Sequence, residues 1–276
     1  MSFRGSYCNA FPGRRYRSDN RPGANHLSDD DPVGVYLPDV YWNTLFGSID
    51  GLTIDMIFEY IAEFTTRQPG FAEPTLPPTR DEKNLNAQLA RYFKRHFSYA
   101  IPSREAVQII CEFASGKKIL EIGAGHGFWA KILEMCGVNI VAIDNFQNFY
   151  ADSDRCFLQV QNLDATEAVR QYRDCDVLMI IDPPTYDENY MFTHMARNSL
   201  QEFTGSSVIL VAERRRHSSL DYFFWKQLRD KKIWKKISCT SLPNFFTKGN
   251  LVLYCYRRVK SDEIIESYES ESDVCA

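Results

Sequence analysis

The amino-acid sequence predicts an α/β fold in which helices cover a largely parallel β-sheet. Two observations lead to this class. From residue 118 onward, short apolar runs alternate with segments of helical periodicity, and the first run leads directly into closely spaced glycines. Near-continuous apolar runs are typical of strands buried on both faces of a parallel sheet. A glycine-rich turn between such a strand and a helix is typical of nucleotide-like binding loops.

The first strand and its loop lie in Lys118–Ala130, with the sequence K-I-L-E-I-G-A-G-H-G-F-W-A. Glycines at a strand-to-helix turn allow positive φ angles and a close approach of a ligand to the backbone. The spacing E-x-G-x-G-x-G is not the dinucleotide pattern, because Phe128 stands where the third glycine would be. A phosphate-binding loop is also disfavoured, since no Gly-Lys-Ser/Thr follows and the Glu121 carboxylate would repel phosphate. The pattern therefore favours a cationic ligand.

A helix and a second strand follow the loop. Phe128–Met135 has helical spacing, and Gly137 is suited to end that helix. The next strand, Asn139–Ile143, ends in Asp144, which lies 19 residues after Gly125. In nucleotide-binding α/β proteins, an acid about 20 residues beyond the glycines accepts hydrogen bonds from the ribose hydroxyls. We therefore predict that Asp144 binds a ribose.

Two further strands are predicted downstream. Phe157–Gln161 is the third, with Asp164 just beyond it, and Asp176–Ile181 is the fourth. The fourth strand runs into the segment Asp182–Tyr186, with the sequence D-P-P-T-Y. Proline cannot continue a central strand, so the chain turns there, beside the glycine loop. Ligands bind at this carboxyl edge of open α/β sheets.

The same alternation continues to the end of the predicted sheet. The remaining elements are a helix at Asp187–Phe203, a strand at Ser207–Ala212 that ends at Glu213, a helix at about Ser219–Asp230, and a terminal pair of strands at Ile233–Thr240 and Leu251–Arg257.

The E-x-G-x-G-x-G loop followed by Asp144 resembles motif I and the next acid of the class I S-adenosylmethionine-dependent methyltransferases. Their cofactor carries a sulfonium and an ammonium group and no phosphate. The resemblance implies a Rossmann-like, seven-stranded methyltransferase sheet. It also implies that Asp144 holds the ribose and Asp164 the adenine amino group, although an acid after a strand is alternatively a helix cap. The implied ligands of the methionine end are the loop residues Glu121, Gly123, Ala124, Gly125 and Gly127.

The segment after the fourth strand resembles the D/N-P-P-Y/F/W motif of amino methyltransferases. In those enzymes the acid or amide and a carbonyl near the prolines accept hydrogen bonds from the target nitrogen, and the aromatic ring stacks on a flat substrate. The resemblance implies four catalytic residues: Asp182, Pro183, Pro184 and Tyr186. Thr185 occupies the aromatic position here, and Tyr186 follows one residue late. A purely structural turn is the alternative.

From Ile101 to Arg258 the chain is also similar to a largely uncharacterised group of methyltransferase-like proteins. They share E-x-G-A-G-x-G-x-W-A and a Pro-Pro loop after the fourth strand, and they often carry Trp where this chain has Asp182. The implied activity is methyl transfer from S-adenosylmethionine to an acceptor that the sequence does not identify. An amino group of a nucleic acid or protein is the candidate acceptor. A non-catalytic binding or assembly module is the alternative from another class.

Composition divides the chain into four segments. At 276 residues and 44% hydrophobic content, the chain can bury a sizeable core. The predicted segments are a disordered tail at 1–35 with Arg4, Arg14, Arg15, Arg17 and Arg21, a helical extension at 36–100 with helices at Tyr41–Thr66 and Asp81–Phe97, an S-adenosylmethionine-binding methyltransferase domain at 101–260, and an acidic disordered tail at 261–276.

Several classes of function are disfavoured. The eight cysteines contain no close pair, so neither a zinc site nor a secreted disulfide framework is expected, and we predict reduced thiols. The sequence has no leading apolar segment and no apolar run of membrane-spanning length, which favours a soluble, intracellular protein of the cytoplasm or nucleus. The net charge of −4 disfavours indiscriminate nucleic-acid binding. Local contacts through Arg214–Arg216 or the N-terminal arginines are compatible with that charge.

Overall fold

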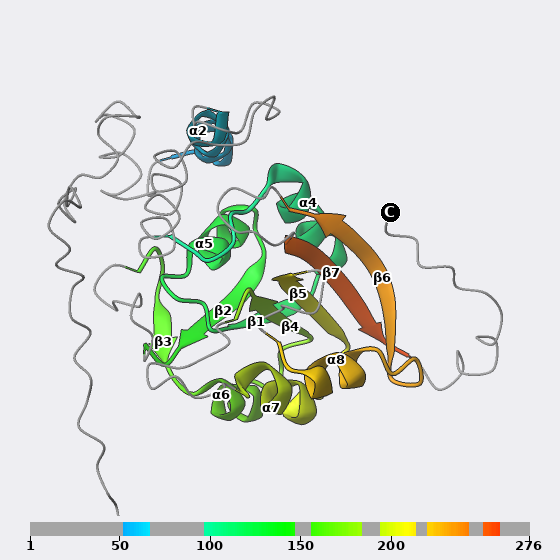
Figure 1. Ribbon diagram of the computed structural model, residues 1–276. Helices are drawn as coiled ribbons and strands as arrows, with labels where there is room; N and C mark the ends of the chain where they lie inside the picture. The colour runs from blue at the N-terminus through cyan, green and yellow to red at the C-terminus, as the bar shows by residue number, and fades with distance from the viewer. Residues whose placement is uncertain are drawn as a thin grey trace, which may run out of the picture. The chain divides into compact units, whose positions relative to one another are not determined.

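A computed structural model describes residues 52–66, 97–146, 156–183, 194–213, 220–242 and 251–259. These residues form a seven-stranded sheet with helices on both faces (Figure 1). The elements, in chain order, are α2 (Ile54–Thr66), α4 (Arg104–Phe113), β1 (Lys118–Ile122), α5 (Phe128–Met135), β2 (Asn139–Asp144), β3 (Val160–Asn162), α6 (Ala165–Gln171), β4 (Val177–Ile181), α7 (Met195–Glu202), β5 (Ser207–Glu213), α8 (Tyr222–Leu228), β6 (Trp234–Ser241) and β7 (Leu251–Arg258).

The strands are ordered β3-β2-β1-β4-β5-β7-β6. Strands β1 to β5 are all parallel, whereas β7 is antiparallel to both β5 and β6. The predicted seven-stranded α/β fold with a terminal strand pair is confirmed. Because parallel strands share one carboxyl edge, the ends of β1, β2 and β4 lie close together, as the pairs Ile122–Ile143 and Ile122–Ile180 show.

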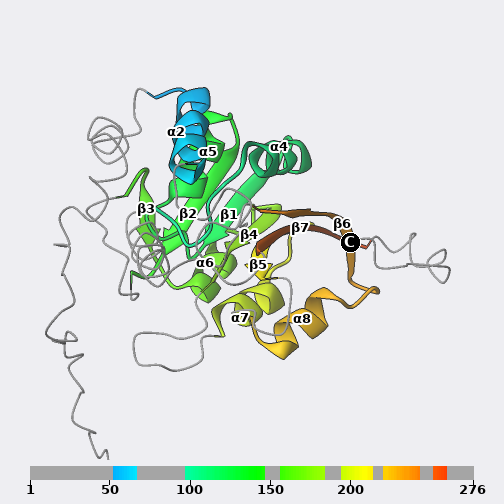
Figure 2. The same ribbon diagram turned by 45° about the horizontal axis from the view of Figure 1, so that its top comes forward.

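The sheet separates two apolar clusters. On one face, α4 and α5 pack against alternate strand residues such as Ile119, Met179 and Ile209. On the other face, α6, α7 and α8 pack against the residues between them, such as Leu120 and Leu178. Figures 1 and 2 show these two helical layers above and below the sheet. Successive side chains of a buried strand point to opposite faces of the sheet, so each strand contributes residues to both apolar clusters.

Side-chain caps decide where several helices begin. Helix α2 begins at Ile54, where the Thr53 hydroxyl accepts a hydrogen bond from the backbone N–H of Met56 at 3.2 Å. It covers the second part of the helix predicted at Tyr41–Thr66, and residues 41–51 lie outside the described residues. Helix α8 begins at Tyr222, because Asp221 accepts from the backbone N–H of Phe224 at 2.7 Å. Several predicted segments lie outside the described residues. They are the helix at 81–97 except for its last residue, the first part of the helix at 187–203, and both tails.

Strand β3 is shorter than predicted. It begins at Val160, whereas the apolar pattern predicts a start at Phe157. The backbone N–H of Phe157 donates to the carbonyl oxygen of His126 in the glycine loop at 2.8 Å, so this residue is bonded to the loop and not to the strand ladder. Its apolar side chain packs against the rings of Phe97 and Phe128 instead.

One cysteine contradicts the expectation of reduced thiols. Cys239 on β6 is disulfide-bonded. The cysteines at 111, 136, 156, 175 and 255 are free. Spacing along the sequence could not reveal this bond, because disulfide formation depends on distance in the fold.

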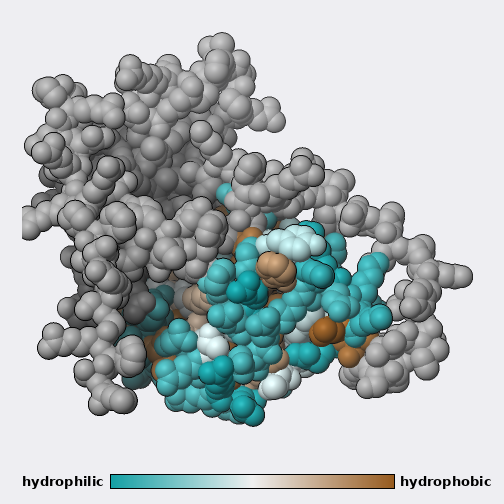
Figure 3. Space-filling model, turned by 60° about the horizontal axis from the view of Figure 1, so that its bottom comes forward, coloured by the Kyte–Doolittle hydropathy of each residue, from teal (hydrophilic) through white to brown (hydrophobic). Residues whose placement is uncertain are grey.

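The face of the molecule on the side of α6, α7 and α8 is largely hydrophilic (Figure 3). Figure 3 shows polar surface around the α6–α8 side, interrupted by separate apolar side chains. No helix in the described ranges is both long enough and apolar enough to cross a membrane.

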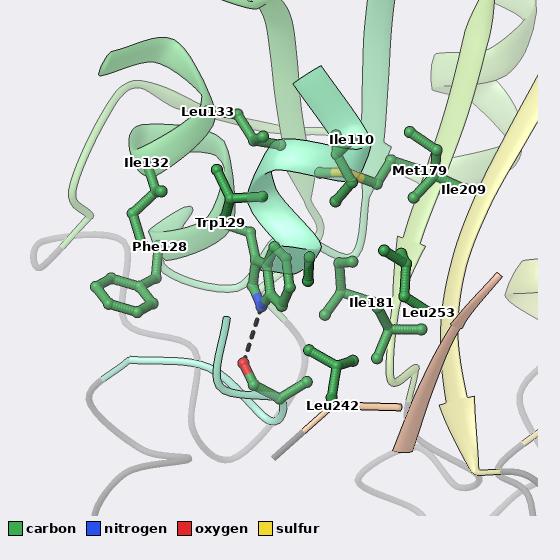
Figure 4. Packing of buried hydrophobic residues seen from close by; sticks show 14 of the residues in the cluster. Ile110, Phe128, Trp129, Ile132, Leu133, Met179, Ile181, Ile209, Leu242 and Leu253 are labelled. Carbon is green, nitrogen blue, oxygen red and sulfur yellow. Dashed lines mark hydrogen bonds between the residues drawn. The ribbon is translucent and has the colours of Figure 1, made fainter. Parts of the chain in front are cut away.

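Trp129, in the first turn of α5, points into the apolar cluster between this helix and the sheet (Figure 4). Its side chain is 1% exposed, and its indole Nε1–H donates to the carbonyl oxygen of Ala100 at 2.8 Å. The bond fastens the segment before α4 to the first turn of α5. Trp129 is therefore a core residue.

We expect Trp129→Phe to lower the free energy of unfolding by about 2–4 kcal/mol, because it leaves a buried carbonyl without its donor and a void beside it. Urea unfolding of the two chains measures the difference. Phe223→Leu, an exposed apolar change on α8, is the matched control and should shift the free energy by less than about 0.5 kcal/mol. An equal effect of the two changes would contradict the role of the indole bond.

Candidate cofactor site

The glycine loop, residues 123–127, joins β1 to α5 and is held by backbone hydrogen bonds. The N–H of Ala124 donates to the Ile143 carbonyl on β2 at 2.9 Å, and the N–H of Gly127 donates back to the Ala124 carbonyl at 2.9 Å. His126, also in the loop, is buried. The loop is therefore anchored at the carboxyl edge of β1 and β2.

The two sides of this loop differ in how closely they are packed. Gly127 has φ +73°, and a Cβ there would lie 2.1 Å from Leu158 Cδ2 and 2.9 Å from Val160 Cγ2. A Cβ on Gly125, which has φ +55°, would meet no atom within 4 Å. The loop is thus pressed against the β3 segment on one side and open above Gly125. The open side leaves room for a ligand to approach the backbone.

Asp144 ends β2 directly beside this open side. Its Oδ2 accepts a hydrogen bond from the backbone N–H of Gly125 at 2.8 Å, and its Oδ1 accepts one from the N–H of Phe146 at 2.7 Å. The side chain is mostly buried, at 9% exposure. The structure therefore brings together the loop glycine and the acid that the spacing of 19 residues predicts as partners.

Glu121 is the second carboxylate of the site, and it is 1% exposed. Its Oε2 has no hydrogen-bond partner. Burial and the nearby negative charge of Asp144 raise the pKa of Glu121 from its ordinary 4.5 to about 8, while a hydrogen bond from the backbone N–H of Ala130 acts in the opposite direction. Between Ile119 and Ala130 the chain has no Lys or Arg. With this raised pKa, Glu121 is mostly protonated at neutral pH, and the negative charge beside the loop is that of Asp144. A bound cation would favour the ionised form of Glu121, whereas a phosphate would be repelled.

Asp164 caps helix α6. Its Oδ1 accepts hydrogen bonds from the backbone N–H groups of Thr166 at 2.8 Å and Glu167 at 3.1 Å. The preceding residue, Leu163, donates its N–H to the Asp144 carbonyl at 3.1 Å, so Asp164 lies next to the end of β2. In this structure the Asp164 carboxylate thus acts as a helix cap, which is the alternative that the sequence leaves open. A contact with adenine stays a prediction.

Asp182 and Pro183 lie at the carboxyl end of β4, next to β1. The backbone N–H of Asp182 donates to the Val211 carbonyl on β5 at 2.8 Å, and its φ is +36°. Few residues other than glycine adopt this conformation, and Asp is among those that tolerate it best. Pro183 is buried. Strained backbone at a strand end is a reason to suspect function. Pro184, Tyr186 and Arg214–Arg216 lie outside the described residues.

Two residues near the loop were not found from the sequence. Phe146 follows Asp144 by two positions and has φ +51°, an unusual conformation for an aromatic residue. Met195, the first residue of α7, places its Cε 3.0 Å from the position of a Cβ on Gly123. Phe146 could have been found from the sequence, because it lies only two positions after Asp144. No local signal exists for Met195, because its helix comes 72 residues after Gly123 in the chain.

Among the described residues, no group of three or more His, Cys, Asp or Glu side chains is arranged to hold a metal ion.

Comparisons with known proteins give similarity at the level of structure only. No family model matches the chain, and no curated protein matches it either. Among solved structures, it is similar to magnesium protoporphyrin IX methyltransferase from Synechocystis PCC 6803, with 12% identity over 75% of this chain and 97% of the other and a TM-score of 0.41. Another is a tRNA (uracil-54, C5)-methyltransferase from Pyrococcus abyssi, with 15% identity over 58% of this chain and 38% of the other and a TM-score of 0.38.

A proposed S-adenosylmethionine-dependent methyltransferase from Streptococcus mutans shows the same degree of likeness, with 14% identity over 56% of this chain and a TM-score of 0.38. The chain spans about half of that protein, 48% of its length. The fold class of this chain is defined by its own strand order and not by these similarities.

The buried Glu121 makes stability depend on pH. Its pKa is raised on folding, so the folded chain binds the proton more tightly than the unfolded chain does. The resulting contribution to the free energy of unfolding is full below pH 4.5 and is lost as the pH rises through about 8. Glu121→Gln cannot ionise. We therefore expect the variant to gain stability relative to the native chain as the pH rises from 5 to 8, by up to about 1.4 kcal/mol per pH unit.

Urea unfolding of both chains at pH 5, 6, 7, 8 and 9 measures this gain. Glu105→Gln, an exposed change on α4, is the control and should show no such trend. A difference between Glu121→Gln and the native chain that stays constant across this range would refute a raised pKa of the buried carboxylate.

Proposed function

We propose that this chain is an S-adenosylmethionine-dependent methyltransferase and that residues 101–260 carry the activity. The observation that carries the proposal is the hydrogen bond between the Gly125 N–H and the Asp144 carboxylate. It joins the loop that the sequence compares with motif I to the acid predicted to bind the ribose. The proposal is further supported by the two carboxyl groups at the loop, Glu121 and Asp144, and by the lack of Lys and Arg between Ile119 and Ala130. This arrangement suits a ligand that bears a sulfonium and an ammonium group and no phosphate, because its positive charge would favour ionisation of Glu121.

The residues at the loop fit this cofactor in three respects. Gly125 leaves open space above the backbone. The Glu121 Oε2 is a buried acceptor without a partner, as a cationic ligand would require. Each Asp144 oxygen accepts one backbone N–H and retains further acceptor capacity for a ribose hydroxyl. We assign the methionine end to Glu121, Gly123, Ala124, Gly125 and Gly127, the ribose to Asp144, and the adenine to Asp164.

When bound, the cofactor supplies an electrophilic methyl group on a sulfonium. The contribution of the chain would be to hold the acceptor in line with that group and to exclude water, so that most of the rate enhancement comes from proximity and alignment. We assign the acceptor site to Asp182, Pro183, Pro184 and Tyr186 at the carboxyl end of β4. The Asp182 carboxylate would accept a hydrogen bond from an acceptor amine and fix its orientation.

The first expected outcome concerns the cofactor. Asp144→Ala should weaken binding of S-adenosylhomocysteine about 10- to 150-fold in calorimetry, because a charge-assisted hydrogen bond contributes about 1.5–3 kcal/mol. Asp174→Ala, which removes an exposed acid at the opposite edge of the sheet, is the matched control and should bind as the native chain does. Tight binding of NAD with no response to S-adenosylmethionine or S-adenosylhomocysteine would exclude the proposal.

The second expected outcome concerns catalysis at Asp182. Asp182→Gly removes the carboxylate and accommodates φ +36° without strain, whereas Asp182→Asn keeps an acceptor oxygen and tolerates the same backbone. Transfer of a radiolabelled methyl group to nucleic-acid and protein fractions should fall about a hundredfold or more in the first variant and much less in the second, with unchanged cofactor affinity.

Full activity in Asp182→Gly would remove the amino-group assignment and leave methyl transfer standing. A chain that binds neither S-adenosylmethionine nor S-adenosylhomocysteine and methylates no fraction would instead be a non-catalytic binding or assembly module.

A further inference from the structure

The outer face of α8 exposes two adjacent aromatic rings. Tyr222 is 72% exposed and Phe223 is 60% exposed, and their ring centroids lie 5.6 Å apart in an edge-to-face arrangement. Burying aromatic rings on folding is strongly favourable, so their exposure at the start of a helix needs an explanation. The opposite side of the helix, with Phe224 and Leu228, is buried in the core. The fold therefore does not need the two exposed rings.

Cations lie on the same face of the helix. Lys226 and Arg229 follow Tyr222 by four and seven positions and are exposed. Lys231 and Lys232, also exposed, come directly after the helix. Between Tyr222 and Lys232 the chain carries four cations and a single acid, Asp230, in a protein whose net charge is −4. This α8 face, defined as Tyr222, Phe223, Lys226 and Arg229, is thus a basic and aromatic surface.

Arginines also lie over aromatic rings on this side. The guanidinium of Arg197, on α7, lies 5.8 Å from the ring centroid of Phe223, and that of Arg229 lies 4.9 Å from the ring of Trp225. These pairs place positive charge next to aromatic rings, and flat, electron-rich groups stack on such surfaces. Nucleobases are flat and electron-rich, and the phosphates that join them are negatively charged.

The α8 face is connected to the candidate cofactor site. Helix α8 begins after the carboxyl end of β5, the same edge at which the glycine loop lies. Asp221, the cap of α8, contacts His194 Nδ1 at 3.3 Å and Arg197 Nη1 at 3.5 Å, which ties it to the start of α7. Met195, between those two residues, lies against Gly123.

We propose that the α8 face is a binding surface for single-stranded nucleic acid, on which bases stack against Tyr222 and Phe223 while Lys226 and Arg229 contact phosphates. The inference rests on the proposed function, because it makes the bound strand the carrier of the methyl acceptor. Stacking accepts any base and phosphate contacts accept any sequence, so the surface positions the strand without reading its sequence.

The test is fluorescence anisotropy of the full chain with a labelled 12-nucleotide single-stranded RNA. Tyr222→Ala/Phe223→Ala should weaken binding about tenfold or more, because stacking of each base on an aromatic ring contributes about 1–3 kcal/mol. The exchange Tyr222→Phe/Phe223→Tyr keeps both rings and should bind as the native chain does. Thermal unfolding should be unaffected in both variants, because the rings lie outside the core.

A second pair of variants tests the binding of phosphates. Lys226→Gln/Arg229→Gln should reduce the slope of log affinity against log salt by roughly 0.7 for each phosphate that the variant no longer neutralises. Arg173→Gln/Lys235→Gln removes the same charge from the α6 side and from β6 and should leave the slope unchanged.

Two ligands separate this inference from charge attraction alone. An abasic strand of equal length and polyglutamate should each bind at least tenfold more weakly than the RNA. Equal binding of the abasic strand or of polyglutamate would overturn the inference, as would unchanged affinity in Tyr222→Ala/Phe223→Ala. Calorimetry with S-adenosylmethionine on the same samples is a separate measurement. Loss of cofactor binding alone would refute the proposed function but not the nucleic-acid surface.

Discussion

The carboxylate of Asp144 is the interaction on which the carboxyl edge of the sheet depends. Through its two oxygens it binds the glycine loop at Gly125 and the chain at Phe146. The carbonyl of the same residue accepts the N–H of Leu163, which sets the start of α6 beside β2. Asp144 thus joins its own segment to the glycine loop and to the start of α6. A buried carboxylate is stable in such a place because backbone donors satisfy it.

Charge is distributed unevenly between this edge and the outer surface. Inside, Glu121 and Asp144 lie near each other at the loop, and their repulsion together with burial raises the pKa of Glu121. Outside, the α8 face carries Lys226 and Arg229 beside exposed rings. The paired carboxyl groups inside suit a small cation, whose charge would favour ionisation of Glu121, and the basic aromatic exterior suits a polyanion. The net charge of −4 conceals this separation, because it sums the whole chain.

Most of the fold could be predicted because it is encoded locally. The apolar runs of β1, β2, β4 and β5 were placed within one or two residues of their bounds, since strands buried on both faces leave an unbroken apolar signature. Predictions were wrong where a contact elsewhere in the chain decided the outcome. Phe157 is bonded to His126 and is not part of β3.

The candidate site divides in the same way. The sequence by itself determined the glycine loop, the acid at the end of β2 and the turn after β4, because each depends on residue type and spacing along a strand–loop–helix unit. Only the tertiary structure decided that Phe157 bonds to His126, that Met195 lies against Gly123, and that Asp182 adopts a left-handed conformation. It also decided which rings of α8 stay exposed. These features depend on how separate elements pack together, and the pattern of hydrophobic residues within one element does not specify its neighbours.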